Sequence, residues 1–301
     1  MSYVETVLGR IEADDLGIVH IHEHLYVDLS PVSGPTGKLD DVDGVIEELK
    51  DFKSKGGRTI VEVTNIGMGR DTNILRKISE MSGVNVVFST GFYIEKMYPN
   101  YVFELDEEGI SEVMVKEIRE GVGDLKSKPW VIGEVGTSGK NFSENEKKVL
   151  RASVIAHEKT KAPIITHNSE DEGLEQVEFL MECGMDLSKV ILGHQDLVPD
   201  MGYYVKVLKT GVNIAFDTFG KTHYLSEEKR VRNLVMLVKM GYLEQLFISS
   251  DITRNKYLRK NGGYGYTHII EKIIPWLRRE GLSEDEVETI MVENPKRFLT
   301  K

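Results

Sequence analysis

The sequence predicts an α/β protein, a (β/α)₈ barrel formed as one domain by residues 1–301. Eight short runs of apolar and β-branched residues recur along the chain, helix-patterned stretches fill the gaps, and no Pro/Gly/Ser-rich linker divides the chain. Strands that read as nearly continuous apolar runs are buried on both faces, as parallel strands under helices are. A barrel needs about 250 residues, so a length of 301 permits one.

The predicted elements alternate from strand to helix in chain order. The eight predicted strands are residues 17–25, 58–64, 84–91, 130–138, 162–169, 189–196, 211–220 and 246–251. The clearest helices between them are residues 40–55, 143–160 and 226–241, with apolar positions at helical spacing and charged outer positions. Ser143 and Glu146 form a capping-box pattern at the start of the second of these helices. An open doubly wound sheet is the alternative, but its glycine-rich turn is incomplete in Gly67-Met68-Gly69-Arg70.

Composition excludes several classes of partner. With 38 Lys+Arg against 49 Asp+Glu, the net charge of −11 opposes binding to a nucleic-acid backbone. The one cysteine, Cys183, excludes an intrachain disulfide and a cysteine-built zinc site. No apolar run approaches the roughly 20 residues that a membrane span needs. We therefore expect a cytoplasmic protein that binds a small-molecule substrate, with a homodimer left open.

Candidate metal ligands gather where the predicted strands end, which is the functional end of such a barrel. His22 and His24 lie two residues apart on the first strand and so share a face. The fourth, fifth, sixth and eighth strands add Glu134, His167, His194 and Asp251. Imidazole and carboxylate ligands suit Zn²⁺, and also Mn²⁺, Co²⁺ or Fe²⁺. A catalytic zinc usually takes three protein ligands, so six candidates predict two divalent ions.

Two residues close to these candidate ligands in the sequence are expected to have structural roles. We expect His20, deeper on the same face as His22, to be a hydrogen-bonded core histidine. Glu23 points to the opposite face of the strand, so we expect it to pair with the surrounding helices.

In these motifs the chain resembles the phosphotriesterase family of the amidohydrolase superfamily, along nearly its whole length. The matching segments include GIVHIHEHL (17–25), GRTIVEVTNIGMGRD (57–71), STGFY (89–93), VIGEVG (131–136), FDTFG (216–220), GGYGYTHI (262–269) and ENPKRFL (293–299). The resemblance implies a (β/α)₈ fold and a dinuclear hydrolase. It also implies that His22, His24 and Asp251 bind the more buried metal, that His167 and His194 bind the more exposed one, and that Glu134 bridges them together with a hydroxide. Many relatives use a carboxylated lysine as the bridge, whereas Glu134 resembles the glutamate-bridged subgroup.

The resemblance also implies a catalytic role for Asp251, which would take a proton from the nucleophile and return it to the leaving group. The competing Ser/His/Asp hydrolase lacks a Gly-x-Ser-x-Gly elbow. A metal-binding barrel without turnover is a further alternative, but it need not keep the complete ligand set that this chain has.

The segment after the eighth strand points to the substrate class. Residues 252–266 contain Arg254, Lys256, Arg259 and Lys260 in an acidic protein, which favours docking of an anionic substrate group. We expect Arg254 and Lys256 to bind that group, and His223 to lie near the substrate. Tyr93 and Tyr98 are predicted to form an aromatic wall, as tyrosines do in lactone-hydrolysing relatives. A carboxylic ester, lactone or amide with an anionic substituent is therefore favoured over a neutral organophosphate triester.

Overall fold

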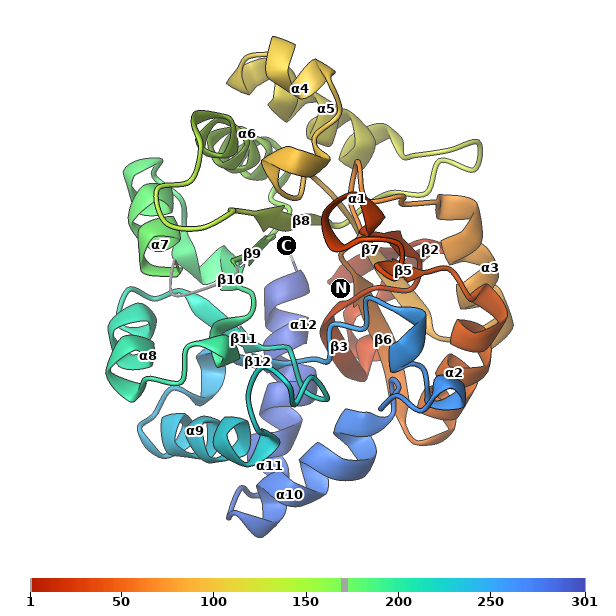
Figure 1. Ribbon diagram of the computed structural model, residues 1–301, viewed down its shortest axis with the longest axis vertical. Helices are drawn as coiled ribbons and strands as arrows, with labels where there is room; N and C mark the ends of the chain where they lie inside the picture. Colours follow the sequence, from red (N-terminus) through yellow and green to blue (C-terminus); the bar gives the residue numbers. More distant parts are fainter. Residues whose placement is uncertain (1, 169–172, 301) are drawn as a thin grey trace.

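The computed structural model describes residues 2–168 and 173–300 and contains the predicted barrel (Figure 1). Eight parallel strands pair in the order β12-β11-β10-β9-β8-β7-β6-β3. They are β3 (Ile18–Glu23), β6 (Gly57–Glu62), β7 (Asn85–Thr90), β8 (Val131–Gly136), β9 (Ile164–His167), β10 (Val190–Leu192), β11 (Asn213–Phe216) and β12 (Leu246–Ile248). Every predicted strand is thus confirmed, although Ser169, the last residue predicted for the fifth, lies outside the described residues.

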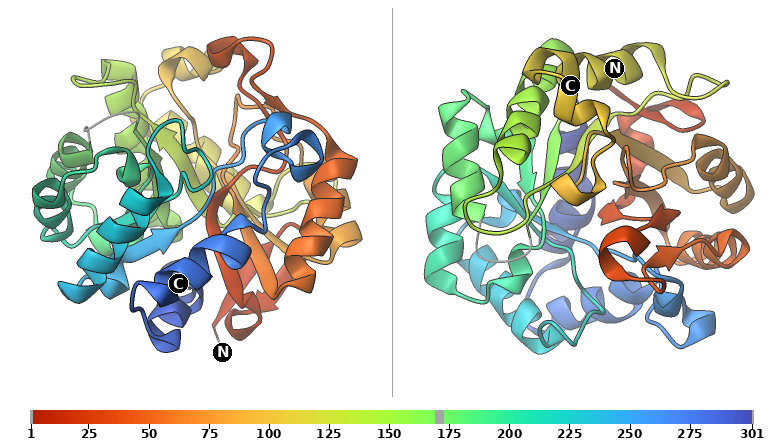
Figure 2. Two further views of the ribbon diagram at one scale, coloured as in Figure 1. Left: turned by 60° about the horizontal axis from the view of Figure 1, so that its bottom comes forward. Right: turned by 45° about the horizontal axis from the view of Figure 1, so that its top comes forward.

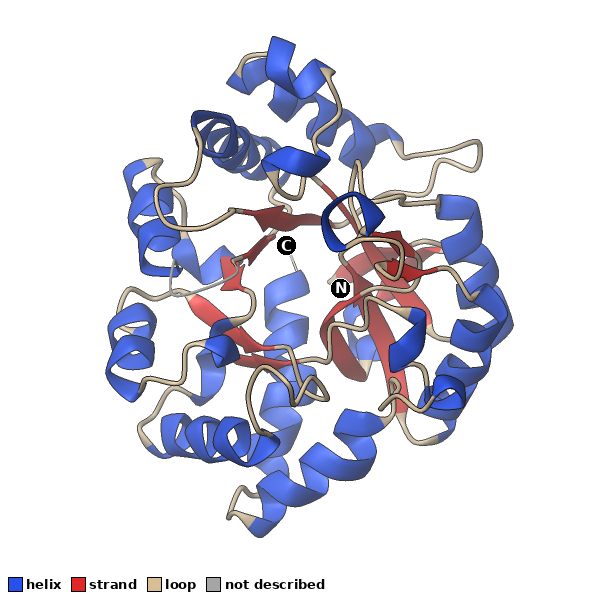
Figure 3. Cartoon of the chain, viewed as in Figure 1, coloured by secondary structure: helices blue, strands red, loops and turns tan. Residues whose placement is uncertain are grey.

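Helices surround the strands, as the two turned views and the view coloured by secondary structure show (Figures 2 and 3). The longer ones are α2 (Val42–Ser54), α3 (Thr72–Ser82), α5 (Glu107–Glu120), α6 (Glu144–Thr160), α7 (Gly173–Glu182), α8 (Met201–Leu208) and α9 (Glu227–Lys239). Shorter helices are α1 (Ser30–Ser33), α4 (Tyr101–Glu104), α10 (Ile274–Arg279), α11 (Glu284–Glu288) and α12 (Asn294–Leu299). The predicted capping box of α6 is present, with Ser143 and Glu146 each accepting the other's backbone N–H. None of the helices in the described part of the chain combines the length and the apolar character of a bilayer span.

An N-terminal hairpin closes the end of the barrel where the strands begin. Its strands, β1 (Tyr3–Thr6) and β2 (Gly9–Glu12), pair antiparallel, and Val7 donates to the carbonyl of Val86 near the start of β7. The interior of the barrel is filled by side chains from the strands together with Phe298 and Leu299. A second small pair, β4 (Val27–Asp28) with β5 (Lys38–Leu39), follows β3. Apolar side chains therefore fill the interior of the barrel, and the polar candidate ligands lie at the carboxyl ends of the strands.

The seam between β12 and β3 is held by a buried carboxylate. Glu23, at the end of β3, accepts hydrogen bonds from Ser249 Oγ at 2.8 Å, Ser250 N at 2.7 Å and Ile252 N at 2.9 Å. His20 Nδ1 lies 3.2 Å from the same carboxylate, within the core as expected. The prediction that Glu23 pairs with the surrounding helices is therefore wrong. Its partners are the backbone and a hydroxyl just beyond β12, because the barrel closes β12 against β3.

Candidate metal centre

The six predicted ligands meet around the Glu134 carboxylate at the carboxyl ends of the strands. Glu134 Oε1 lies 3.3 Å from His24 Nε2, and Glu134 Oε2 lies 3.3 Å from His22 Nε2 and 2.9 Å from His167 Nδ1. His194 Nε2 is 3.9 Å from Oε2. Asp251 Oδ1 completes the group, 3.2 Å from His24 Nε2. The two oxygens of Glu134 thus face different histidines, which is the arrangement that a bridging carboxylate requires.

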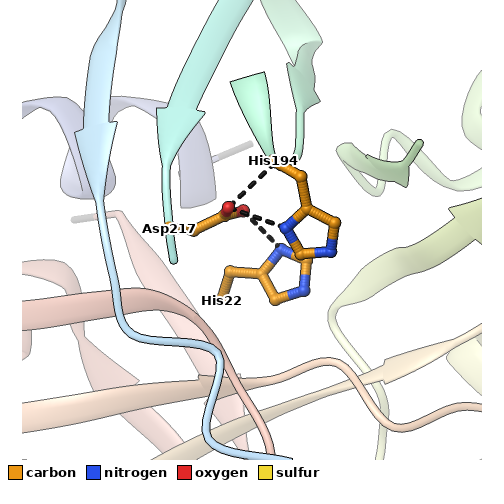
Figure 4. Close-up of side chains that lie close together, drawn as sticks. All are labelled: His22, His194 and Asp217. Atoms are coloured by element: carbon orange, nitrogen blue, oxygen red, sulfur yellow. Dashed lines mark hydrogen bonds and ion pairs between the residues drawn. The ribbon is translucent and has the colours of Figure 1, made fainter. Parts of the chain in front are cut away.

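Two of the histidines are oriented by one aspartate (Figure 4). Asp217, just after β11, is fully buried, with Oδ2 2.9 Å from His22 Nδ1 and Oδ1 2.8 Å from His194 Nδ1. Oδ1 also accepts the backbone N–H of His194 at 2.9 Å. The Nδ1 atoms of both rings therefore face Asp217, and their Nε2 atoms point toward Glu134.

The other two histidines are held in a similar way. His24 Nδ1 lies 2.7 Å from Thr64 Oγ1, which itself donates to Glu62. His167 Nε2 lies 3.1 Å from the hydroxyl of Tyr93. Each of the four rings thus has one nitrogen on a protein group and the other directed at Glu134. Metal-binding histidines are oriented by such outer partners.

The unpaired atoms of the site fit metal ions. Both ring nitrogens of His22 and Nε2 of His24 are buried and form no hydrogen bond with the described residues, and His22 Nδ1 meets Asp217 only as an ion-pair contact. Such orphaned buried nitrogens cost about 1 to 3 kcal/mol each unless a further partner binds them. Two of the groups of described side chains with metal-ligand spacing are His22, His24, Glu134 and Glu134, His167, His194. Imidazole nitrogens and carboxylate oxygens are ligands that Zn²⁺ accepts.

Electrostatics keep the carboxylates of the site ionised. Burial alone would raise the pKa of the Glu134 carboxyl, but the neighbouring His167 and His22 hold that pKa well below its usual range. Burial would also raise the pKa of the Asp251 carboxyl, but the Lys221 ammonium and His24 lower that pKa below its usual value. Both carboxyl groups are therefore ionised in these surroundings, as carboxylate metal ligands must be.

The local backbone conformation orients two of the candidate ligands. His194 and Asp251 both have positive φ, 58° and 48°, a left-handed conformation that non-glycine residues adopt at a cost. Each residue lies just beyond a short strand, β10 or β12. The turn ends the strand and brings the side chain over the barrel mouth.

A cavity of about 250 Å³ opens above the ligands. It is lined by Leu29, Ser33, Tyr93, Glu134, His167, Asn168, His194, Leu197, Thr218, Lys221, Tyr224, Asp251, Thr253 and Arg254. Lys221 is buried, and its ammonium contacts Asp251 Oδ2. The cavity therefore joins four of the candidate ligands to two cationic side chains.

The predicted substrate-binding residues divide into two groups. Tyr93 and Arg254 line the cavity. Tyr98 lies beyond a 3₁₀ turn (Glu95–Met97) and lines a separate pocket with Phe103 and Phe142, because that turn carries it away from Tyr93.

Two further predicted residues also lie outside the cavity lining. Lys256 is exposed, with its ammonium 5.1 Å from the centroid of the Tyr257 ring. His223 is exposed and lies against Tyr224, with ring centroids 4.1 Å apart and the ring planes tilted by 43°.

Sequence reasoning missed Asp217 and Lys221. Both were visible in the sequence, since FDTFGK (216–221) places a carboxylate and an amine directly after the seventh strand. A search of every strand end for charged side chains would have found them. Their partners, however, come from other strands and could not be read from the chain.

Comparison with known proteins decides the family. The Phosphotriesterase family matches residues 2–299. The chain belongs to this family. Among its curated relatives, the phosphotriesterase homology protein of Escherichia coli (strain K12) is 37% identical over 287 residues, 95% of this chain and 98% of that protein. The N-acetyltaurine hydrolase of Dictyostelium discoideum is 32% identical over 361 residues, 99% of this chain and 97% of that protein.

Solved structures of the family superpose closely on the chain. The crystal structure of the E. coli homology protein, complexed with phosphate in its active site, has a TM-score of 0.92 at 36% identity and covers 95% of this chain and 99% of that one. A lactonase from Listeria monocytogenes has a TM-score of 0.93 at 27% identity and covers 99% of both chains. Relatives named as hydrolases, together with the ligand cluster, support a metal-dependent hydrolase of the phosphotriesterase family.

Proposed function

We propose that this member of the phosphotriesterase family is a dinuclear metal-dependent hydrolase of a carboxylic amide, ester or lactone that carries an anionic group. The observation that carries the proposal is the position of Arg254, which lines the same cavity as Glu134, His167, His194 and Asp251. A reacting carbonyl at the ligand cluster and an anion at Arg254 would then fit one small substrate.

The metal centre proposed here uses His22, His24 and Asp251 at one position and His167 and His194 at the other, with Glu134 shared. Two divalent cations bound there, Zn²⁺ by the preference of these ligands, would lower the pKa of a water and polarise the carbonyl oxygen. Mn²⁺, Co²⁺ and Fe²⁺ suit the same ligand set. Asp251 lines the cavity, which supports a role in which it would accept a proton and pass it to the leaving nitrogen or oxygen.

The anionic group is inferred from the pairing of the cations in the segment after β12. Arg259 contacts Asp51 and Glu271, and Lys260 contacts Asp41, so these two charges are balanced on the surface. Arg254 makes no ion pair with any residue in 2–168 or 173–300 and is half-buried at the cavity. A guanidinium in a cleft favours a carboxylate, sulfonate or phosphate ligand.

The names of relatives favour an amide as the substrate and a lactone as the second candidate. The N-acetyltaurine hydrolases act, by name, on an amide with a sulfonate, which matches both halves of the cavity. The Listeria relative is a lactonase. A neutral organophosphate triester, suggested by organophosphorus hydrolases among the solved structures, leaves Arg254 without a partner. A metal-binding barrel without turnover is the remaining alternative.

The decisive experiment is metal analysis of the purified protein, followed by a hydrolysis screen with a pH indicator. The screen compares N-acetyltaurine and N-acyl amino acids with N-acetylethylamine, an amide without the anion, and adds lactones, esters and a paraoxon-like triester. We expect two metal ions per chain and the highest kcat/KM on an anionic acyl compound. A preference for the triester or for the uncharged amide would overturn the substrate class, and a metal-loaded protein inactive on every compound would favour the barrel without turnover.

A further inference from the structure

The proposed metal positions share one outer-sphere group, the Asp217 carboxylate (Figure 4). It contacts His22, assigned above to one position, through Oδ2 and His194, assigned to the other, through Oδ1. The two imidazole rings are adjacent, with centroids 5.0 Å apart. We infer that Asp217 is a positioning residue that couples the two metal positions by fixing the tautomers of both histidines. This inference rests on the proposed metal centre.

The chemistry of a neutral imidazole explains the coupling. One ring nitrogen carries a proton and the other an electron pair, and only the latter can bind a metal. An ionised carboxylate accepts hydrogen bonds and donates none. Asp217 therefore selects the proton on Nδ1 of both rings and leaves the electron pair on Nε2. Those Nε2 atoms lie 3.3 Å and 3.9 Å from Glu134 Oε2, on the metal side of the rings.

The two oxygens of Asp217 are not equivalent, because they have different polar contacts. Oδ1 also accepts the backbone N–H of His194 at 2.9 Å, a donor that cannot become an acceptor. Oδ2 accepts no hydrogen bond from the described residues, and its polar contact is the ion-pair contact with His22 Nδ1 at 2.9 Å. In Asp217→Asn the amide oxygen should stay at the Oδ1 position, because a buried pair of opposed donors costs about 1 to 3 kcal/mol.

The amide nitrogen of Asp217→Asn would then face His22. Its N–H requires an acceptor, so the proton of the His22 ring moves to Nε2 and that atom can no longer bind a metal. His194 keeps its tautomer. Replacing one oxygen of one side chain by an amide nitrogen should thus impair the His22 position and preserve the His194 position. Asp217→Ala removes both acceptors and should weaken both positions.

The test is metal binding, measured separately from activity. Metal-free wild type, Asp217→Asn and Asp217→Ala are titrated with Zn²⁺, and bound metal is counted after removal of excess. Circular dichroism and thermal unfolding verify the fold of each variant. We expect two tight ions in wild type. In Asp217→Asn one ion should stay tight and the other bind about 10 to 100-fold more weakly, and in Asp217→Ala both should weaken.

Double variants identify the position that survives. His24→Asn added to Asp217→Asn should leave the tight ion in place, whereas His167→Asn added to Asp217→Asn should remove it. Two tight ions in Asp217→Asn, or equal weakening of both positions in Asp217→Asn, would refute the coupling. Loss of the His194 position instead of the His22 position would refute the tautomer argument. A wild type that binds no metal would refute the proposed metal centre itself, so the two failures are distinguishable.

Discussion

Glu23 accepts the backbone N–H of Ser250 at 2.7 Å, and this bond crosses the seam of the barrel directly beside Asp251. The same carboxylate holds Ile252 N on the other side of Asp251 at 2.9 Å. Asp251, a candidate ligand with positive φ, is thereby fixed from both flanks by a residue adjacent to His22 and His24. The motif HEH (22–24) therefore provides two metal-ligand candidates and the support of a third.

The first prediction concerns this support. In Glu23→Gln a donor replaces one acceptor among three N–H and O–H donors, so at least one buried group loses its partner. We expect a loss of about 2 to 4 kcal/mol in the free energy of unfolding, measured in urea. Metal binding at the position that contains Asp251 should weaken as well. Glu228→Gln on the exposed face of α9 is the matched control and should change stability by less than about 0.5 kcal/mol. Equal stability of the two variants would contradict the role of Glu23.

The role of Glu23 also marks the limit of what the sequence could predict. The strands were predictable because buried parallel strands are apolar runs. The six candidate ligands were predictable because they interrupt those runs near their ends: His22, His24, Glu134, His167, His194 and Asp251. Alternation along a strand gave the direction of Glu23 but not its partner. That partner, Ser250, is 227 residues away and is set by barrel closure.

Loops were predictable only in composition. Cations after the eighth strand suggested an anion site, but the path of residues 254–260 decides which of them faces the cavity. A 3₁₀ turn (Asn255–Tyr257) follows Arg254 and leaves Lys256 exposed beside Tyr257. Such short turns have no periodic pattern long enough to be recognised in a sequence.

Arg254 provides the second prediction. Arg254→Gln should raise KM for an anionic amide by about tenfold or more, because a charge-assisted hydrogen bond in a cleft is lost. The kcat/KM for N-acetylethylamine should stay within about twofold, since that amide has no anion to bind. Steady-state kinetics on both compounds measure the difference.

The control for Arg254 is a matched change of charge far from the cavity. Arg232→Gln removes an exposed guanidinium of α9 that pairs with Glu228 and should alter neither amide's kinetics. An equal loss on the anionic and the uncharged amide in Arg254→Gln would show that Arg254 acts on structure and not on the anion.

The third prediction follows from the chemistry of Glu134. A glutamate carries its own carboxylate, whereas a carboxylated lysine must first react with CO₂. Metal-free protein supplied with Zn²⁺ in buffer free of bicarbonate should therefore regain full metal content and activity. Added bicarbonate should change neither. Metal counting and initial rates in the two buffers test this, and a requirement for bicarbonate would mean that Glu134 is not the bridging group.

The fourth prediction separates the two roles of Asp251. Asn keeps the size of the side chain but neither binds a cation as strongly nor moves a proton at neutral pH. Asp251→Asn should retain the ion held by His167 and His194 and lower kcat by about 10² to 10⁴-fold. Metal counting and kinetics at saturating metal measure the two effects independently. If kcat remained near that of wild type once both positions were filled, proton transfer would have to be assigned to another group, and Lys221, which contacts Asp251 in the same cavity, would be the next residue to replace.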